Sequence, residues 1–198
     1  VGCLSLIGLN EAGIAVGTTN LKTLDARPGV PYLSLIHRAL ACRRYEDAVA
    51  SICAAPRAGA HFYYVACRDE RACVIECSAT QAARVELERG ARGQTNHCRI
   101  PANVAAQASA PSSSSRARLA RIEALLAGAR GRLDLAAAKG FLADRANGED
   151  AILREDYDDT STNGAVVMVP GRGELWACGG SPETGAWVEL VRASPAPG

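Results

Sequence analysis

The chain has 198 residues, which is enough for one domain with a core of its own. Its 22 Lys and Arg nearly balance its 21 Asp and Glu, so it carries no net field that would recruit nucleic acid or an anionic membrane. No apolar run approaches the roughly 20 residues that span a bilayer, and the start, VGCLSLIGLNEAG, lacks the basic residues of a signal peptide. We therefore expect one soluble domain over residues 1–198 that binds a small molecule.

The first half of the chain predicts strands and two helices. Two apolar strands flank NEAG, where Asn10 and Gly13 are turn residues, which indicates a hairpin. After the loop KTLDARPG, GVPYLSLIHRAL has the apolar spacing of a helix, and YEDAVASICAA predicts a second. HFYYVACRDERACVIECSATQAARVEL then alternates as antiparallel strands broken at RDER.

The polar stretch GQTNHC, residues 93–98, is expected to begin or end a further strand. In an extended segment neighbouring side chains point to opposite faces, so Asn96 and Cys98 should share one face and His97 should lie on the other. This alternation argues against His97 acting as the base of a Cys98 nucleophile.

The second half predicts two helices and three strands. The run ASAPSSSSR, residues 108–116, should be an exposed loop whose last serine caps the following helix, although a linker between domains is the alternative. RARLARIEALLAGARG and DLAAAKGFLADRANG are amphipathic helices, each followed by glycine. NGAVVMVPGRGELWACGG is a hairpin and GAWVELVRA a final strand, so the overall order is α+β.

Eight cysteines are scattered through apolar stretches, unlike the pattern of a small disulfide scaffold. The closest pair, Cys73 and Cys77, has no matching His or Cys pair at zinc-ligand spacing, so we expect no metal and no cofactor. Buried, reduced thiols of this kind favour a cytoplasmic protein.

Taken in order, the segments IGLNEAGIAVGTTNL, GVPYLSLIHRAL, GQTNHC, the Ser-rich run before RLARIEALLA, AILRED and NGAVVMVPGRGELWACGG resemble the acyl-coenzyme A:6-aminopenicillanic acid acyltransferase family. The resemblance covers essentially the whole chain. It implies the N-terminal-nucleophile hydrolase fold, a four-layer αββα sandwich. It also implies a precursor that cuts itself to expose a cysteine, which attacks an acyl group with its own α-amino group as base. The expected activity is acyl transfer or amide hydrolysis on N-acyl or acyl-thioester substrates.

The resemblance assigns roles to individual residues. Asn96 matches the asparagine that helps to bind the oxyanion in the family, a contact that is worth about 3 kcal/mol in such sites. Asn20 stands where related bile-salt and penicillin V hydrolases carry another oxyanion asparagine, and the alternative is that Asn20 caps the loop that follows its strand. His97 is expected to be a hydrogen-bonding residue behind the site rather than a catalyst.

The chain departs from the family at two places. The nucleophile and an acidic residue belong tens of residues before the NEAG hairpin, so we expect that this N-terminal segment of the same precursor is missing and that the chain alone is inactive. At TSTNG, Asn163 stands where the fungal enzyme has an arginine. Two alternatives stay open: an enzyme that uses Cys3 as nucleophile after cleavage behind Gly2, and a non-catalytic binding or structural module. The acyl group, the acceptor and the formation of a homo-oligomer are left open.

Overall fold

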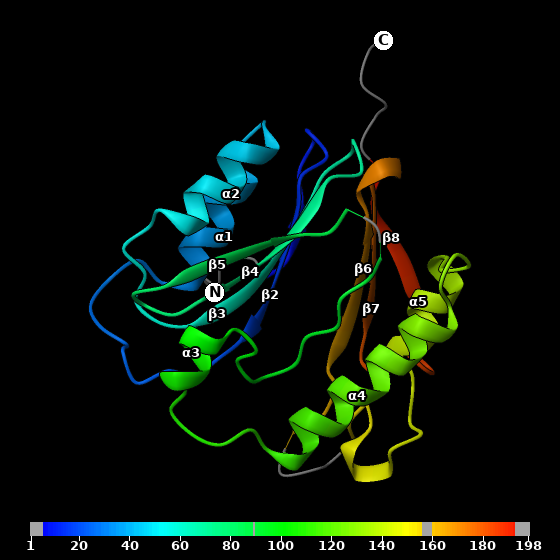
Figure 1. Cartoon of the computed structure of the whole chain (residues 1–198). Coiled ribbons are helices and arrows are strands. Elements are labelled where there is room, and N and C mark those ends of the chain that lie inside the picture. Colours follow the sequence, from blue (N-terminus) through cyan, green and yellow to red (C-terminus); the bar gives the residue numbers. More distant parts are fainter. Residues whose placement is uncertain (1–5, 89, 156–159, 193–198) are drawn as a thin grey trace.

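The computed structural model of the chain describes residues 6–88, 90–155 and 160–192. Within them, two antiparallel sheets combine with helices, which confirms the predicted α+β organisation (Figure 1). The first sheet is a meander whose strands pair in chain order, and the second is built the same way. The first contains β1 (Gly8–Leu9), β2 (Ala15–Asn20), β3 (His61–Ala66), β4 (Ala72–Cys77) and β5 (Ala82–Glu86). The second contains β6 (Gly164–Val169), β7 (Glu174–Gly179) and β8 (Trp187–Arg192).

The NEAG hairpin joins β1 to β2 as the sequence predicts. Asn10 Oδ1 accepts the Ile14 N–H at 2.9 Å, and Gly13 has a φ of +81°, which favours glycine over residues with a side chain. The Asn10 amide also donates to the carbonyls of Leu40 and Cys42, both at 2.8 Å. The turn is therefore fastened to the end of the following helix.

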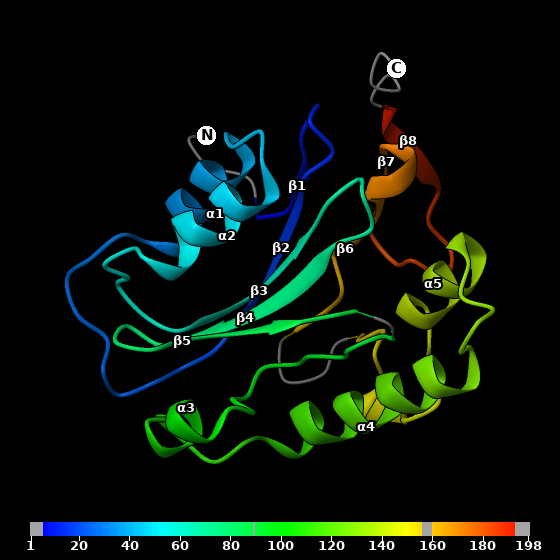
Figure 2. The same ribbon diagram turned by 45° about the horizontal axis from the view of Figure 1, so that its top comes forward.

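Helices α1 (Tyr32–Leu40) and α2 (Tyr45–Cys53) cover one face of the first sheet (Figure 2). The core lies between them and includes the buried side chains of Val16, Leu35, Ile36, Val49, Ile52, Tyr63 and Ile75. Arg57 is 4% exposed, and its guanidinium donates to the carbonyls of Ile52, Cys53 and Ala55. These bonds satisfy backbone acceptors at the end of α2 that the helix itself leaves unpaired.

The opposite face of the first sheet packs a second core of Leu21, Ala60, Phe62, Val74 and Cys98. Below this face runs the segment from Gly93 to the short helix α3 (Pro101–Ala105), as Figure 2 shows. Glu76 of β4, 1% exposed, holds the segment because its carboxylate accepts the N–H groups of Arg99 at 2.8 Å and Ile100 at 2.9 Å. This carboxylate fixes where the following helix begins.

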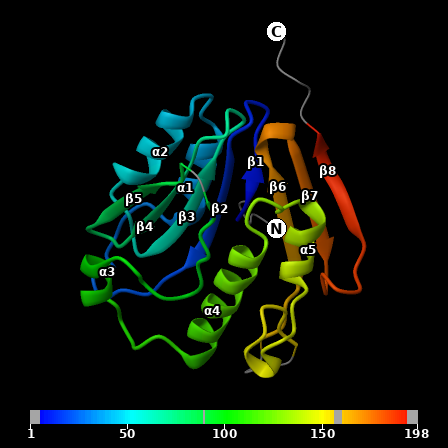
Figure 3. The ribbon, with the colours of Figure 1, turned by 45° about the vertical axis from the view of Figure 1, so that its right-hand side comes forward.

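The second sheet lies beside α4 (Ser113–Gly128) and α5 (Leu135–Leu142) (Figure 3). The Lys139 ammonium of α5 sits 3.9 Å from the Trp176 ring centre and 5.0 Å from that of Trp187, which joins the helix to this sheet. The hairpin between β6 and β7 turns through the short helix η2 (Pro170–Arg172), as the PGRGE motif predicts. A further short helix, η1 (Gly148–Asp150), follows α5.

The structure corrects the prediction for the Ser-rich run. Residues 108–112 lie outside the helix and are exposed or half-buried, but α4 begins at Ser113. Ser114 is 5% and Ser115 1% exposed, so the prediction of an exposed loop is wrong for Ser113–Arg116. The capping residue is Ser112, whose hydroxyl accepts the Ser115 N–H at 3.1 Å. Likewise, α5 ends at Leu142, well before Gly148.

Candidate active site

The segment that carries Asn96 is not a strand. Residues 93–95 have no regular structure and the backbone bends at Asn96 and His97. Its backbone groups bind side chains instead of a neighbouring strand: the Cys98 N–H donates to Gln107 Oε1 at 2.8 Å, and the Asn96 N–H donates to Ser115 Oγ at 3.0 Å. The predicted alternation therefore fails, because Asn96 is exposed while Cys98 is 4% exposed against the first sheet.

The Asn96 amide is held from two sides. Its Oδ1 accepts Arg118 Nη2 of α4 at 2.9 Å, and its Nδ2 donates to the Asn20 carbonyl oxygen at 3.3 Å. The Arg118 contact fixes which end of the amide carries the nitrogen. Because an amide nitrogen carries two hydrogens, one N–H meets no acceptor among the described residues.

The structure thus brings Asn20 and Asn96 together at one end of β2. The contact uses the backbone of Asn20, which closes the strand opposite His61. The Asn20 side chain makes no hydrogen bond to another described residue, and it lines a cavity of about 490 Å³ with Tyr32 and His61. The resemblance assigned both asparagines to oxyanion binding; in the structure they are joined through the Asn20 backbone and not through the Asn20 side chain.

His97 faces α4 and not Cys98. Its Nδ1 lies 2.8 Å from Ser115 Oγ and 3.3 Å from Thr95 Oγ1. Burial first, and then the positive charge of Arg99, lower the pKa of His97 below its usual range, which favours the neutral ring. The imidazole therefore contacts the same serine, Ser115, that accepts the Asn96 N–H.

Ser115 is the centre of this arrangement. Its Oγ meets the Asn96 N–H, His97 Nδ1 and Thr95 Oγ1, the last at 3.1 Å, and its carbonyl accepts the Thr95 hydroxyl at 2.8 Å. Sequence reasoning missed both Ser115 and Arg118. The spacing Ser-x-x-Arg at the start of an amphipathic helix was the available signal, since residues three apart lie on the same face.

The Cys98 thiol lacks the properties of a nucleophile. Burial, followed by the charge of Glu76, raises the pKa of the Cys98 thiol to about 11. Cys3, the alternative nucleophile, lies outside the described residues. Among residues 6–88, 90–155 and 160–192, no group of three or more His, Cys, Asp or Glu is placed to hold a metal ion.

The arrangement suits the stabilisation of negative charge on an oxygen atom. A fixed, exposed amide N–H lies beside a guanidinium, and such donors act on the oxyanion of acyl transfer. A family model described as acyl-coenzyme A:6-aminopenicillanic acid acyl-transferase matches residues 5–181. The chain therefore belongs to this acyltransferase family. A comparison with curated proteins found no match.

Within the part of the chain that the structure describes, none of the helices has the length and apolar character of a membrane span.

Proposed function

We propose that the chain is the body of a cysteine N-terminal-nucleophile acyltransferase or amidohydrolase that acts on N-acyl or acyl-thioester substrates, and that Asn96 binds the oxyanion. The observation that carries the proposal is the fixed amide of Asn96. Its oxygen is bound to Arg118 and its backbone to Ser115, so one N–H has a defined direction and an open position. Fixed dipoles of this kind need no reorganisation when charge develops.

In the proposed reaction, a cysteine thiol attacks the acyl carbonyl carbon and its proton passes to the α-amino group of the same residue. The carbonyl oxygen becomes negative and accepts the free Asn96 N–H, with Arg118 as the nearby positive charge. When the tetrahedral intermediate collapses, the leaving amine or thiolate takes the proton. Water or an acceptor amine then releases the acyl group from the thioester.

We place the nucleophile tens of residues before the NEAG hairpin, as the family resemblance implies. This is supported by the buried state and raised thiol pKa of Cys98, the thiol nearest to Asn96 in sequence. A non-catalytic module that kept the fold is the alternative outcome. We further place the enzyme in the reducing cytoplasm, an assignment supported by the seven described cysteines, which all carry free thiols.

We also propose that the fold is the four-layer αββα sandwich. Two features support it. Helices α1 and α2 cover the far side of the first sheet, while α5 packs against the second (Figure 1). The two sheets approach one another, since a Cβ added at Gly17 of β2 would lie 3.9 Å from Cε of Met168 in β6.

The test uses the protein expressed with its upstream coding sequence, with the mature N-terminus determined by sequencing. Asn96→Ala should lower kcat by about a hundredfold, with little change in KM or in melting temperature, because one oxyanion donor is lost. The matched control is Asn147→Ala, since Asn147 is also exposed and also donates to a backbone carbonyl, that of Ala117 at 3.2 Å. It should leave kcat unchanged.

The outcomes separate the alternatives. Normal turnover by a strongly destabilised Asn96→Ala protein would show that the residue is structural. Turnover by protein that begins at Val1 would contradict the missing nucleophile, and an active N-terminus at Cys3 would identify that residue instead. Inertness of the longer protein towards amides and thioesters alike would favour a non-catalytic module.

A further inference from the structure

A second cavity lies at the end of β2 that is remote from Asn20. It has a volume of about 360 Å³ and opens between the NEAG turn, the turn after β3 and the start of α2. Because β2 has six residues, it separates this cavity from Asn20 by about 17 Å. The charged side chains that line it are Arg43, Arg44, Glu46, Arg68, Asp69 and Arg71.

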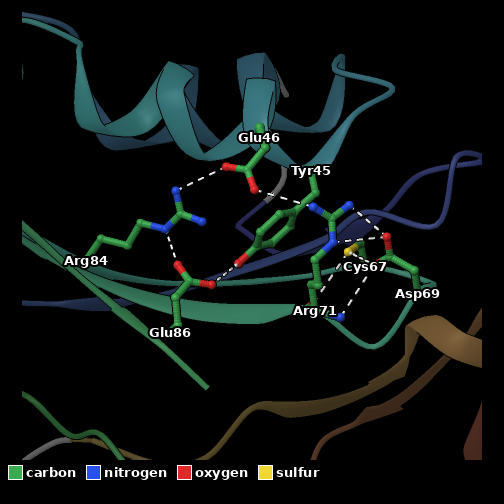
Figure 4. Close-up of polar contacts among 7 residues, drawn as sticks. All are labelled: Tyr45, Glu46, Cys67, Asp69, Arg71, Arg84 and Glu86. Carbon is green, nitrogen blue, oxygen red and sulfur yellow. Dashed lines mark hydrogen bonds and ion pairs between the residues drawn. The ribbon is translucent and has the colours of Figure 1, made fainter. Parts of the chain in front are cut away.

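The two carboxylates of the lining are already engaged. Figure 4 shows Asp69 bound to Arg71, with Oδ2 at 3.0 Å from Nε and 2.7 Å from Nη2. Glu46 binds Arg71 at 3.3 Å and Arg84 at 3.1 Å. These acids therefore neutralise arginines that belong to the wall and to β5, and they leave other positive charge uncompensated.

Arg44 and Arg68 supply that positive charge. Neither guanidinium forms an ion pair with a described carboxylate, whereas Arg43 pairs with Glu11 at 2.7 Å. Arg68 Nη2 is buried and has no hydrogen-bond acceptor among the described residues. Leaving such a donor unpaired is unfavourable, so its position calls for an acceptor that the protein itself does not provide.

The Arg68 side chain is held in place over the NEAG turn. A Cβ added at Gly13 would lie 2.8 Å from Arg68 Cβ and 3.0 Å from Nε, so the stem lies flat against the glycine. The stem of Arg68 is thus packed against the turn. Its orientation is part of the fold.

The start of α2 adds peptide donors to the same cavity. The helix has nine residues, and Arg44 at its N-cap position makes no capping hydrogen bond with its side chain. The first N–H groups of a helix have no partner within it, and the helix dipole favours an anion there. Arg44, Tyr45 and Glu46 at this terminus line the cavity.

We propose that this cavity binds a phosphate-type oxyanion. Arg68, whose Nη2 has no acceptor among the described residues, supplies one guanidinium in the wall, Arg44 supplies a second at the rim, and the first turn of α2 supplies peptide N–H groups. Guanidinium forks and helix N-termini are both suited to tetrahedral oxyanions, which accept several N–H bonds at once. The site is separate from the proposed oxyanion site at Asn96, because β2 lies between them.

The test measures binding of inorganic phosphate to the full chain by calorimetry, and its melting temperature by circular dichroism, with sodium chloride holding the ionic strength constant. The melting temperature should rise with phosphate concentration. Arg68→Met keeps the apolar stem and removes the unpaired donor. It should therefore abolish the phosphate-dependent rise while increasing the melting temperature in phosphate-free buffer.

Two further variants complete the test. Arg44→Ala, at an exposed position, should weaken phosphate binding about tenfold or more, as expected for the loss of a charged donor. Arg132→Met is the control, because Arg132 is exposed, does not line this cavity and, among the described residues, bonds to the Gly128 carbonyl alone; it should respond as the wild type does. A phosphate effect no larger than that of chloride, one matched by acetate, or one that persists in Arg68→Met would overturn the proposal.

Discussion

Replacing Ser115 with alanine removes the single oxygen atom on which the candidate site depends. The Asn96 N–H loses its partner at 3.0 Å and His97 Nδ1 loses its closer partner at 2.8 Å, while Thr95 keeps its bond to the Ser115 carbonyl. Losing two half-buried hydrogen bonds costs about 1–3 kcal/mol each, so we expect the free energy of unfolding to fall by about 3 kcal/mol. For a chain of this length that lowers the melting temperature by about 6–12 °C.

The assay is urea and thermal unfolding followed by far-ultraviolet circular dichroism, with Ser113→Ala as control. Ser113 occupies the first position of the same helix but is exposed, so its replacement should change stability by less than about 0.5 kcal/mol. In protein expressed with its upstream coding sequence, Ser115→Ala should also lower kcat by about tenfold, less than Asn96→Ala, because Arg118 still orients the amide. Equal melting temperatures for the Ser115 and Ser113 variants would refute this account of the site.

Two predictions concern the first sheet. Glu76→Gln should lower the free energy of unfolding, measured in urea, by about 2–4 kcal/mol. The reason is that an amide nitrogen would face a peptide N–H that a carboxylate oxygen now accepts. Unchanged stability would contradict the role of Glu76 in holding the segment at Arg99 and Ile100. Burial lowers the pKa of His61 from 6.5 to about 4, so between these pH values the ring is protonated in the unfolded chain and neutral in the folded one. Stability should therefore fall as the pH drops from about 6.5 to about 4, and His61→Gln should flatten that slope. Identical slopes for the two proteins would rule out His61 as the cause.

The sequence predicted the elements whose signals are local. Asn10 and Gly13 define the hairpin within four residues, and the apolar spacing of α1 and α2 is complete within each helix. The antiparallel meander followed from alternation along HFYYVACRDERACVIEC. Asn96 and Asn20 entered through the resemblance, and the structure places them in contact.

The errors arose where distant polar side chains determine the backbone. GQTNHC alternates in a way that suggests a strand, but its N–H groups bind Ser115 and Gln107, which lie 19 and 9 residues away from their partners. Composition also suggested that the serines were solvated, whereas Ser114 and Ser115 are buried, and Ser115 binds this segment. Neither the alternation of polar and apolar residues nor the composition of a segment reveals such pairing, because the same polar residue types also occur in exposed loops.

Trp176 and Trp187, which Lys139 contacts, determine which part of the protein tryptophan fluorescence reports on. These are the two tryptophans of the chain, and both belong to the second sheet, whereas Tyr32, Tyr45, Tyr63 and Tyr64 belong to α1, α2 and the first sheet. Tryptophan emission therefore reports on the docking of α5, and tyrosine absorbance reports mainly on the other half. If the halves melt separately, the two signals will have different midpoints, and a single fluorescence curve will describe only the part of the protein that lacks Asn96.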